Sequence, residues 1–120
     1  MSEEKSKFES GLIGKYGAGC VASIPVKNGA AYFRQPTAEE WEEMQALREN
    51  PDGTTNRQAY YRLIQKCFAG AWVNDALSSD TLEAIAAKEG PAFMGGPAGS
   101  VVNKLAGTGE RQTTFLGECG

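Results

Sequence analysis

The sequence CVASIPVKNGAAYFR, residues 20–34, decides the first part of the fold. Its two ends, CVASIPV and AAYFR, are short runs rich in apolar and β-branched side chains, which is typical of strands. The pair Asn28-Gly29 lies between them and favours a type I′ turn, because both residues tolerate positive φ. We therefore predict a β-hairpin over residues 20–34 with its turn at 27–29. Pro25 has no backbone N–H, so it belongs on an edge strand or at a bulge.

A first helix is predicted directly after this hairpin. The segment Thr37-Ala-Glu-Glu40 fits a capping box, in which the threonine hydroxyl and the glutamate side chain each accept a hydrogen bond from the other residue's backbone amide. Apolar side chains then recur every three residues at Trp41, Met44 and Leu47, which predicts one buried stripe. The NPDG sequence that follows ends the helix and turns the chain.

A second and stronger core helix is predicted from a cap within residues 54–56 to about Ala69, with Gly70 ending it. The short connection makes the first two helices antiparallel neighbours. The first is acidic and the second basic on its polar side, so we expect some of these charges to pair. The apolar face of the second helix follows helical spacing at Tyr60, Ile64, Cys67, Phe68 and Ala71.

Two shorter helices are predicted in the remainder of the chain. One spans about residues 80–89 and ends at Gly90-Pro91. After a break at Gly95-Gly96, the other restarts at Pro97 and runs to about Ala106. Their inward-facing side chains are expected to be Leu82, Ile85 and Ala86 in the first, and Val101, Val102 and Leu105 in the second.

These elements predict an α+β fold that is mostly α: an N-terminal β-hairpin followed by three to four short helices. Residues 1–11 are expected to form a flexible N-terminus or a short helical lead-in. Residues 12–106 are expected to form a single globular domain, since 120 residues is the usual size for one. Residues 107–120 are polar and contain glycine without any period, so we predict a flexible C-terminal tail.

Composition excludes several classes of function. The net charge is −3 and the 12 Lys and Arg residues are scattered, so we expect neither nucleic acid nor an anionic membrane as a partner. Three widely spaced cysteines do not make a disulfide framework and suit a reducing compartment. The N-terminus is polar and acidic, unlike a signal peptide. The sequence therefore predicts a cytoplasmic protein.

No catalytic apparatus is visible in the sequence. The chain has no histidine, which removes histidine-containing triads and histidine-ligated zinc, and it has no C-x-x-C motif. The acidic cluster Glu39, Glu40, Glu42 and Glu43 is interpreted as a solvated face that complements the helix dipole. We expect no enzyme activity, no cofactor and no metal.

Two glycine-rich segments raise the alternative of nucleotide binding. Gly17 and Gly19 give a G-x-G without a third glycine at the required offset, and a flexible loop explains them. The segment Gly95-Gly-Pro-Ala-Gly-Ser100 lacks the lysine that a phosphate-binding loop carries just before its Ser or Thr. A small nucleotide-binding domain is therefore the least favoured interpretation.

Exposed aromatic residues are common interface anchors, and the partner-binding candidates are chosen on that basis. Tyr61 and Trp72 fall off the main face of the second helix, although partial burial against the third helix explains them equally well. Phe93 joins them as a third aromatic candidate. Arg34 lies between hairpin and helix, where it either bonds a carbonyl or a nearby glutamate or is an ordinary surface arginine.

The segment Lys15-Tyr16-Gly17 and residues 28–40, NGAAYFRQPTAEE, resemble small phage or prophage tail assembly chaperones. Those proteins show a hairpin that ends in an aromatic-Arg-x-Pro-Thr segment and opens a helix. The end of the second predicted helix, Cys67-Phe68-Ala-Gly70, is similar too, and the order of elements matches over about residues 12–106.

This resemblance implies a function without an active site. Such chaperones coat the long hydrophobic tape measure protein, keep it soluble until tail tube subunits polymerise around it, and leave before the virion is complete. The implied partners are thus a tape measure protein and tail tube subunits, in the cytoplasm of a bacterial host, with a homo-oligomer also open. A small structural tail or head-completion protein is the alternative.

Overall fold

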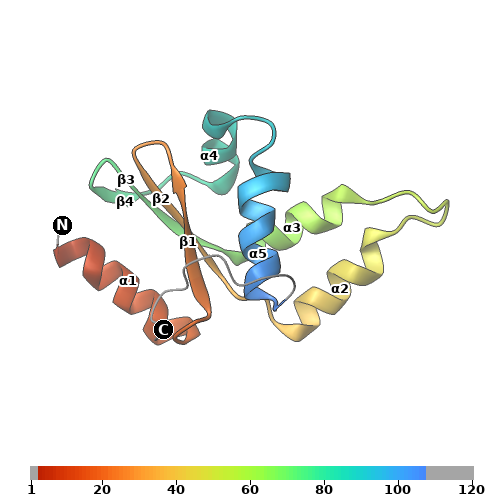
Figure 1. Cartoon of the computed structure of the whole chain (residues 1–120), viewed down its shortest axis with the longest axis horizontal. Helices are drawn as coiled ribbons and strands as arrows, with labels where there is room; N and C mark the ends of the chain where they lie inside the picture. Colours follow the sequence, from red (N-terminus) through yellow and green to blue (C-terminus); the bar gives the residue numbers. More distant parts are fainter. Residues whose placement is uncertain (1–2, 108–120) are drawn as a thin grey trace.

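The computed structural model describes residues 3–107 and is built around a four-stranded antiparallel sheet with the strand order β1-β2-β3-β4 (Figure 1). The predicted hairpin over residues 20–34 is confirmed as β1 and β2, and Pro25 lies on the edge strand β1 as expected. The strands are β1 Val21–Val26, β2 Gly29–Arg34, β3 Phe68–Val73 and β4 Ala76–Ser78.

The turn of this first hairpin differs from the predicted type I′ turn on Asn28-Gly29. Val26 pairs with Gly29, so Lys27 and Asn28 form the turn, and of these two only Asn28 has positive φ, at 64°. Gly29 is needed for a different reason. A Cβ built there would lie 1.8 Å from the carbonyl oxygen of Trp72, so only glycine lets β2 approach β3 this closely.

The predicted fold class, an N-terminal hairpin followed by three to four short helices, is wrong. A helix precedes the hairpin, and residues 68–78, expected to be helical or irregular, form a second hairpin that extends the sheet beside β2. Asn74 and Asp75 close this hairpin with φ of 54° and 61°, the pattern of a type I′ turn.

A bulge explains why β3 was mistaken for the end of a helix. Tyr32 pairs with Gly70 and Phe33 with Phe68, so Ala69 is the extra residue on β3. The extra residue interrupts the alternation of a strand and leaves apolar side chains at a spacing that resembles a helix. The chain leaves the helix at Cys67 because β2 offers it a ladder of backbone hydrogen bonds.

The helix α1, Glu3–Tyr16, occupies most of the segment predicted to be flexible. Gly17 and Gly19, which were interpreted as part of a flexible loop, lie in the short connection of residues 17–20 between α1 and β1. The C-terminal tail predicted over residues 107–120 lies, from residue 108 onward, outside the described residues.

The other helices follow the predictions more closely. The capping box at Thr37 is present, and Asn56 and Thr81 cap the next two helices. The predicted break at Gly95-Gly96 is wrong, because this segment forms a π-helical turn that continues into the last helix, with Pro97 inside it. These elements are α2 Ala38–Arg48, α3 Arg57–Cys67, α4 Leu82–Glu89, η1 Met94–Ala98 and α5 Gly99–Leu105.

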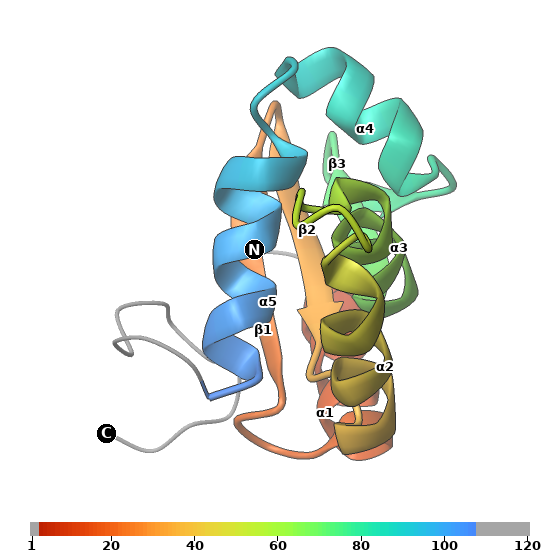
Figure 2. The same ribbon diagram turned by 90° about the vertical axis from the view of Figure 1, so that its right-hand side faces the viewer.

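The sheet separates two apolar clusters of unequal size, because successive side chains of a strand point to opposite faces. On one face α1 covers Val21, Tyr32 and Trp72. The other face packs against α3, α4, α5 and the inner side of α2, which lie together on that side of the sheet (Figure 2). The largest fully buried side chains of this cluster are Phe33, Ile64, Cys67, Val101 and Val102.

Candidate functional site

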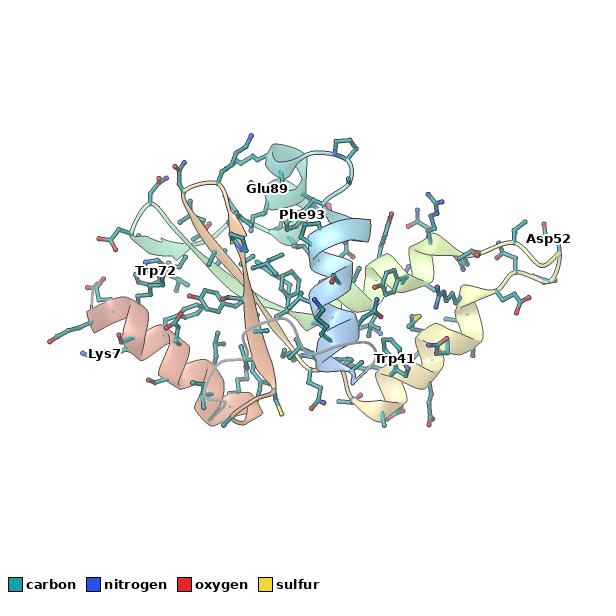
Figure 3. The ribbon with its side chains drawn as sticks, viewed as in Figure 1. Lys7, Trp41, Asp52, Trp72, Glu89 and Phe93 are labelled. Atoms are coloured by element: carbon teal, nitrogen blue, oxygen red, sulfur yellow. The ribbon has the colours of Figure 1, made fainter. Side chains whose placement is uncertain are left out.

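The most prominent surface feature is the helical hairpin made by α2 and α3, which projects from the sheet (Figure 1). Its tip, which carries Asp52, lies far from the sheet (Figure 3). The tip is held by local hydrogen bonds: the Thr54 hydroxyl donates to Asp52 Oδ1 over 2.6 Å, and Asn50 Nδ2 donates to the Thr54 hydroxyl over 2.8 Å. The hairpin is thus a structured arm.

A shallow groove of about 60 Å³ runs between these two helices. Its floor is apolar and consists of Met44, Ala59 and Leu63. Leu47 lines the same groove and is 49% exposed, which makes it one of two large hydrophobic side chains exposed within residues 3–107. The groove therefore offers a site for one apolar side chain of another molecule, beside a leucine that the fold leaves uncovered.

The two sides of the groove carry opposite charges. Glu40 and Glu43 line it from α2, and Arg62 and Lys66 line it from α3. The predicted charge pairing between these helices is wrong, because no ion pair joins α2 to α3 among the described residues. One rim of the groove is therefore acidic, with Glu43, and the other is basic, with Arg62 and Lys66. Both rims are open to a partner.

The Arg34–Glu40 pair sets the orientation of this arm relative to the sheet. Arg34, at the end of β2, donates to both carboxylate oxygens of Glu40 over 2.8 and 2.9 Å. The hydrogen bonds from Arg34 lower the pKa of Glu40 to about 2. Glu40 also accepts from the backbone amide of Thr37 and so completes the capping box that starts α2. The structure therefore shows Arg34 as a bonding residue and not as an ordinary surface arginine, because it also donates to the Gln35 carbonyl over 3.1 Å.

The four predicted partner-binding residues do not come together. Trp72 is 6% exposed and lies under α1, and Phe93 is buried in the larger cluster (Figure 3). Tyr61 is half-buried beside Tyr60, with ring centroids 6.5 Å apart. Arg34 is engaged with Glu40. Trp72 and Phe93 therefore offer no surface while the protein is in this conformation.

The sequence interpretation missed the groove residues. Leu47 was assigned to a buried stripe, but α2 is long enough to carry it beyond the core into the projecting arm. Ala59 and Leu63 are spaced four residues apart and make a second apolar face beside the predicted one. This second face on α3 was a signal that a partner element, or a partner molecule, packs against it.

Gly99, the first residue of α5 and part of the glycine-rich segment 95–100, is required by packing. A Cβ at Gly99 would lie 2.8 Å from the Tyr60 hydroxyl, which donates to the Gly99 carbonyl over 2.8 Å and accepts from Asn103 Nδ2 over 2.7 Å. This close approach of side chain to backbone explains the glycine at this position without a phosphate ligand.

Two further observations concern candidate metal ligands and the Cys67 thiol. Within residues 3–107 no group of three or more His, Cys, Asp or Glu side chains is placed to hold a metal ion. Burial raises the pKa of the Cys67 thiol to about 12, which keeps it in the thiol form at neutral pH. Cys67 therefore behaves as a core side chain.

Comparison of the chain with protein-family models, with curated protein sequences and with solved structures found no match. In the described part of the chain, no helix has the length and the apolar character needed to cross a membrane.

Proposed function

We propose that this protein is a non-enzymatic protein-binding factor that holds an amphipathic helix of its partner against the groove between α2 and α3. The observation that carries this proposal is the apolar groove on a projecting arm, next to a leucine that is 49% exposed. Helix-in-groove recognition uses this combination of an apolar floor and side-chain anchors spaced along one helix face.

The charges on the rims specify the partner further. A helix lying along the groove would meet Glu43 on one side and Arg62 and Lys66 on the other. The complementary helix has an apolar stripe with basic residues along one edge and acidic residues along the other. Opposite charges across a rim govern orientation and association rate more than affinity, so they would select the direction of the bound helix.

The resemblance to phage tail assembly chaperones makes a tape measure protein the first partner to test. A long helical protein with repeated apolar stripes presents many segments that suit one small groove, and many weak contacts along it would keep it soluble. In this proposal the protein leaves when tail tube subunits take its place.

The test is co-expression with candidate tail proteins from the same genome, followed by pull-down and size exclusion. We expect a soluble complex with a long helical protein that is insoluble on its own. Leu47→Asp should abolish the complex, because it places a charge at the apolar anchor. Gln45→Asp is the matched control: Gln45 is exposed on α2 but does not line the groove, so this variant should leave the complex intact.

Two outcomes contradict the proposal. If Leu47→Asp and Gln45→Asp co-purify with the partner equally well, the groove is not the binding site. If the protein instead co-purifies with mature particles, it is a structural component of the tail or head.

A further inference from the structure

The sheet face opposite the main core carries a second apolar surface, and α1 covers it. Phe8 of α1 meets the ring of Tyr32 edge-on, with centroids 5.1 Å apart, and stacks on Trp72 at 6.0 Å. Glu9 accepts a hydrogen bond from the Tyr32 hydroxyl over 2.6 Å, and Leu12 completes the contact one turn later. The helix thus docks through the pattern aromatic-Glu-x-x-Leu.

The sequence of α1 makes it a weak cover for this surface. Leu12 is the only buried residue of α1, all of whose residues are described. Gly11 and Gly14 lie within the helix, and a Cβ at either would meet nothing within 4 Å, so packing does not require these glycines. Mid-helix glycines lower the stability of a helix. Gly17 and Gly19, with φ of 102° and 79°, lie in the short loop that connects α1 to β1.

The covered surface, in contrast, has binding capacity that α1 does not use. The indole N–H of Trp72 is buried without an acceptor, and it is the one buried side-chain nitrogen or oxygen without a hydrogen bond within residues 3–107. Leu77 is 59% exposed and pairs with Trp72 across β3 and β4. Directly opposite residues share a sheet face, so Leu77 extends the surface under α1.

We propose that this surface is a second binding site, for an amphipathic helix of another protein, and that α1 occupies it until that helix displaces it. The site consists of Val21, Tyr32, Trp72 and Leu77. It lies on the other side of the sheet from the groove between α2 and α3, so it does not depend on the function proposed for that groove.

The contacts of α1 specify the helix that would replace it. An aromatic residue is needed against Trp72 and Tyr32, followed by a carboxylate that accepts from the Tyr32 hydroxyl, and an aliphatic residue one turn later. Two additions distinguish a partner from α1: an apolar side chain against Leu77 and an acceptor for the Trp72 indole. A buried donor that gains its acceptor on binding favours the complex.

The test uses the full-length protein and a labelled peptide of residues 3–16 in which Gly11→Ala and Gly14→Ala raise helicity. We expect the peptide to bind and to change the fluorescence of Trp72, recorded in a Trp41→Phe variant in which Trp72 is the only tryptophan. Phe8→Ala in the protein should tighten peptide binding by about tenfold or more, because the open state becomes more populated. A control peptide that also carries Phe8→Ala and Leu12→Ala should not bind.

Further measurements separate this proposal from the groove, from misfolding and from self-association. Leu47→Asp should bind the peptide as the wild type does, since that residue lies in the groove. Hydrogen exchange of the wild-type protein should show α1 amides opening faster than those of β2; if both open only together, the proposal is wrong. Failure of the peptide to bind a folded Phe8→Ala protein would also overturn it. A concentration-dependent dimer that the peptide dissociates would assign the surface to α1 of a second copy instead.

Discussion

The two faces of the sheet are covered in different ways. On one face several helices surround Phe33, and the buried side chains come from α2, α3, α4 and α5 as well as from the strands. On the other face a single helix covers Tyr32 and Trp72, mainly through Phe8 and Leu12. The first face is closed by residues far apart in sequence, whereas the second is closed by one segment at the N-terminal end of the described chain.

This difference indicates that the two faces contribute unequally to stability. Loss of α1 exposes a limited apolar area, whereas loss of any helix on the larger face disrupts a core shared by several elements. The aromatic residues under α1 therefore belong to a surface that can open locally. The following variants test the comparison.

The largest difference is expected between Phe33→Ala and Leu12→Ala. Phe33 is fully buried in the larger cluster, so its truncation should lower the free energy of unfolding by about 3–5 kcal/mol. Leu12→Ala should lower it by less than about 2 kcal/mol, because α1 can undock before the rest of the protein unfolds. Urea unfolding followed by circular dichroism measures both. Equal losses would show that α1 is part of one cooperative unit with the larger core.

An intermediate effect on the free energy of unfolding is expected from the Arg34–Glu40 pair, which holds the arm of α2 and α3 against the end of β2. Glu40→Gln removes the charged hydrogen bonds to Arg34 and should cost about 1–3 kcal/mol of unfolding free energy. Glu43→Gln, one turn away on the rim of the groove, should change stability by no more than about 0.5 kcal/mol. A similar loss of stability in both variants would mean that the hydrogen bonds between Arg34 and Glu40 add nothing to the effect of removing one negative charge from α2.

The same pair predicts a pH dependence with a definite sign. The pKa of Glu40 is lowered from 4.5 to about 2 in the folded protein, so its stabilisation is present above pH 4.5 and is lost as the pH falls toward 2. The stability difference between wild type and Glu40→Gln should therefore shrink across this range. Urea unfolding at several pH values measures it, and a difference independent of pH would contradict the assignment.

The smallest expected effect is a stabilisation of α1 by substitutions within that helix. Gly11→Ala and Gly14→Ala should each stabilise α1 by about 0.5–1 kcal/mol, because alanine has a higher helix propensity than glycine and a Cβ at either position would meet no atom within 4 Å. Hydrogen exchange should slow in α1 with little change in β2. Gly70→Ala is the control with the opposite sign: its φ is +128° and a Cβ would lie 3.0 Å from Phe8, so it should loosen α1. Slower exchange in all three variants would contradict this account.

Some features of the candidate site could be predicted from sequence patterns and others could not. The capping box at Thr37 and the antiparallel neighbours α2 and α3 were predictable, because both depend on residues close in sequence. The exposure of Leu47 was not, since a three-residue spacing shows which side chains share a face and not where the core ends along the helix. From the sequence alone, Arg34 either forms a hydrogen bond with a carbonyl or a nearby glutamate or is an ordinary surface arginine. The structure decides this, because it places the end of β2 beside the start of α2, where Arg34 reaches Glu40.

The sequence by itself determined the elements that local chemistry can specify: the first hairpin, the start of α2, and the apolar stretch of α5. Only the tertiary structure decided that residues 68–73 are a strand, because their backbone hydrogen bonds go to β2, which is more than thirty residues away. It also decided that Trp72 is buried, since its cover, α1, lies at the other end of the described chain. Long-range pairing and packing depend on which surfaces meet, and no local pattern contains that information.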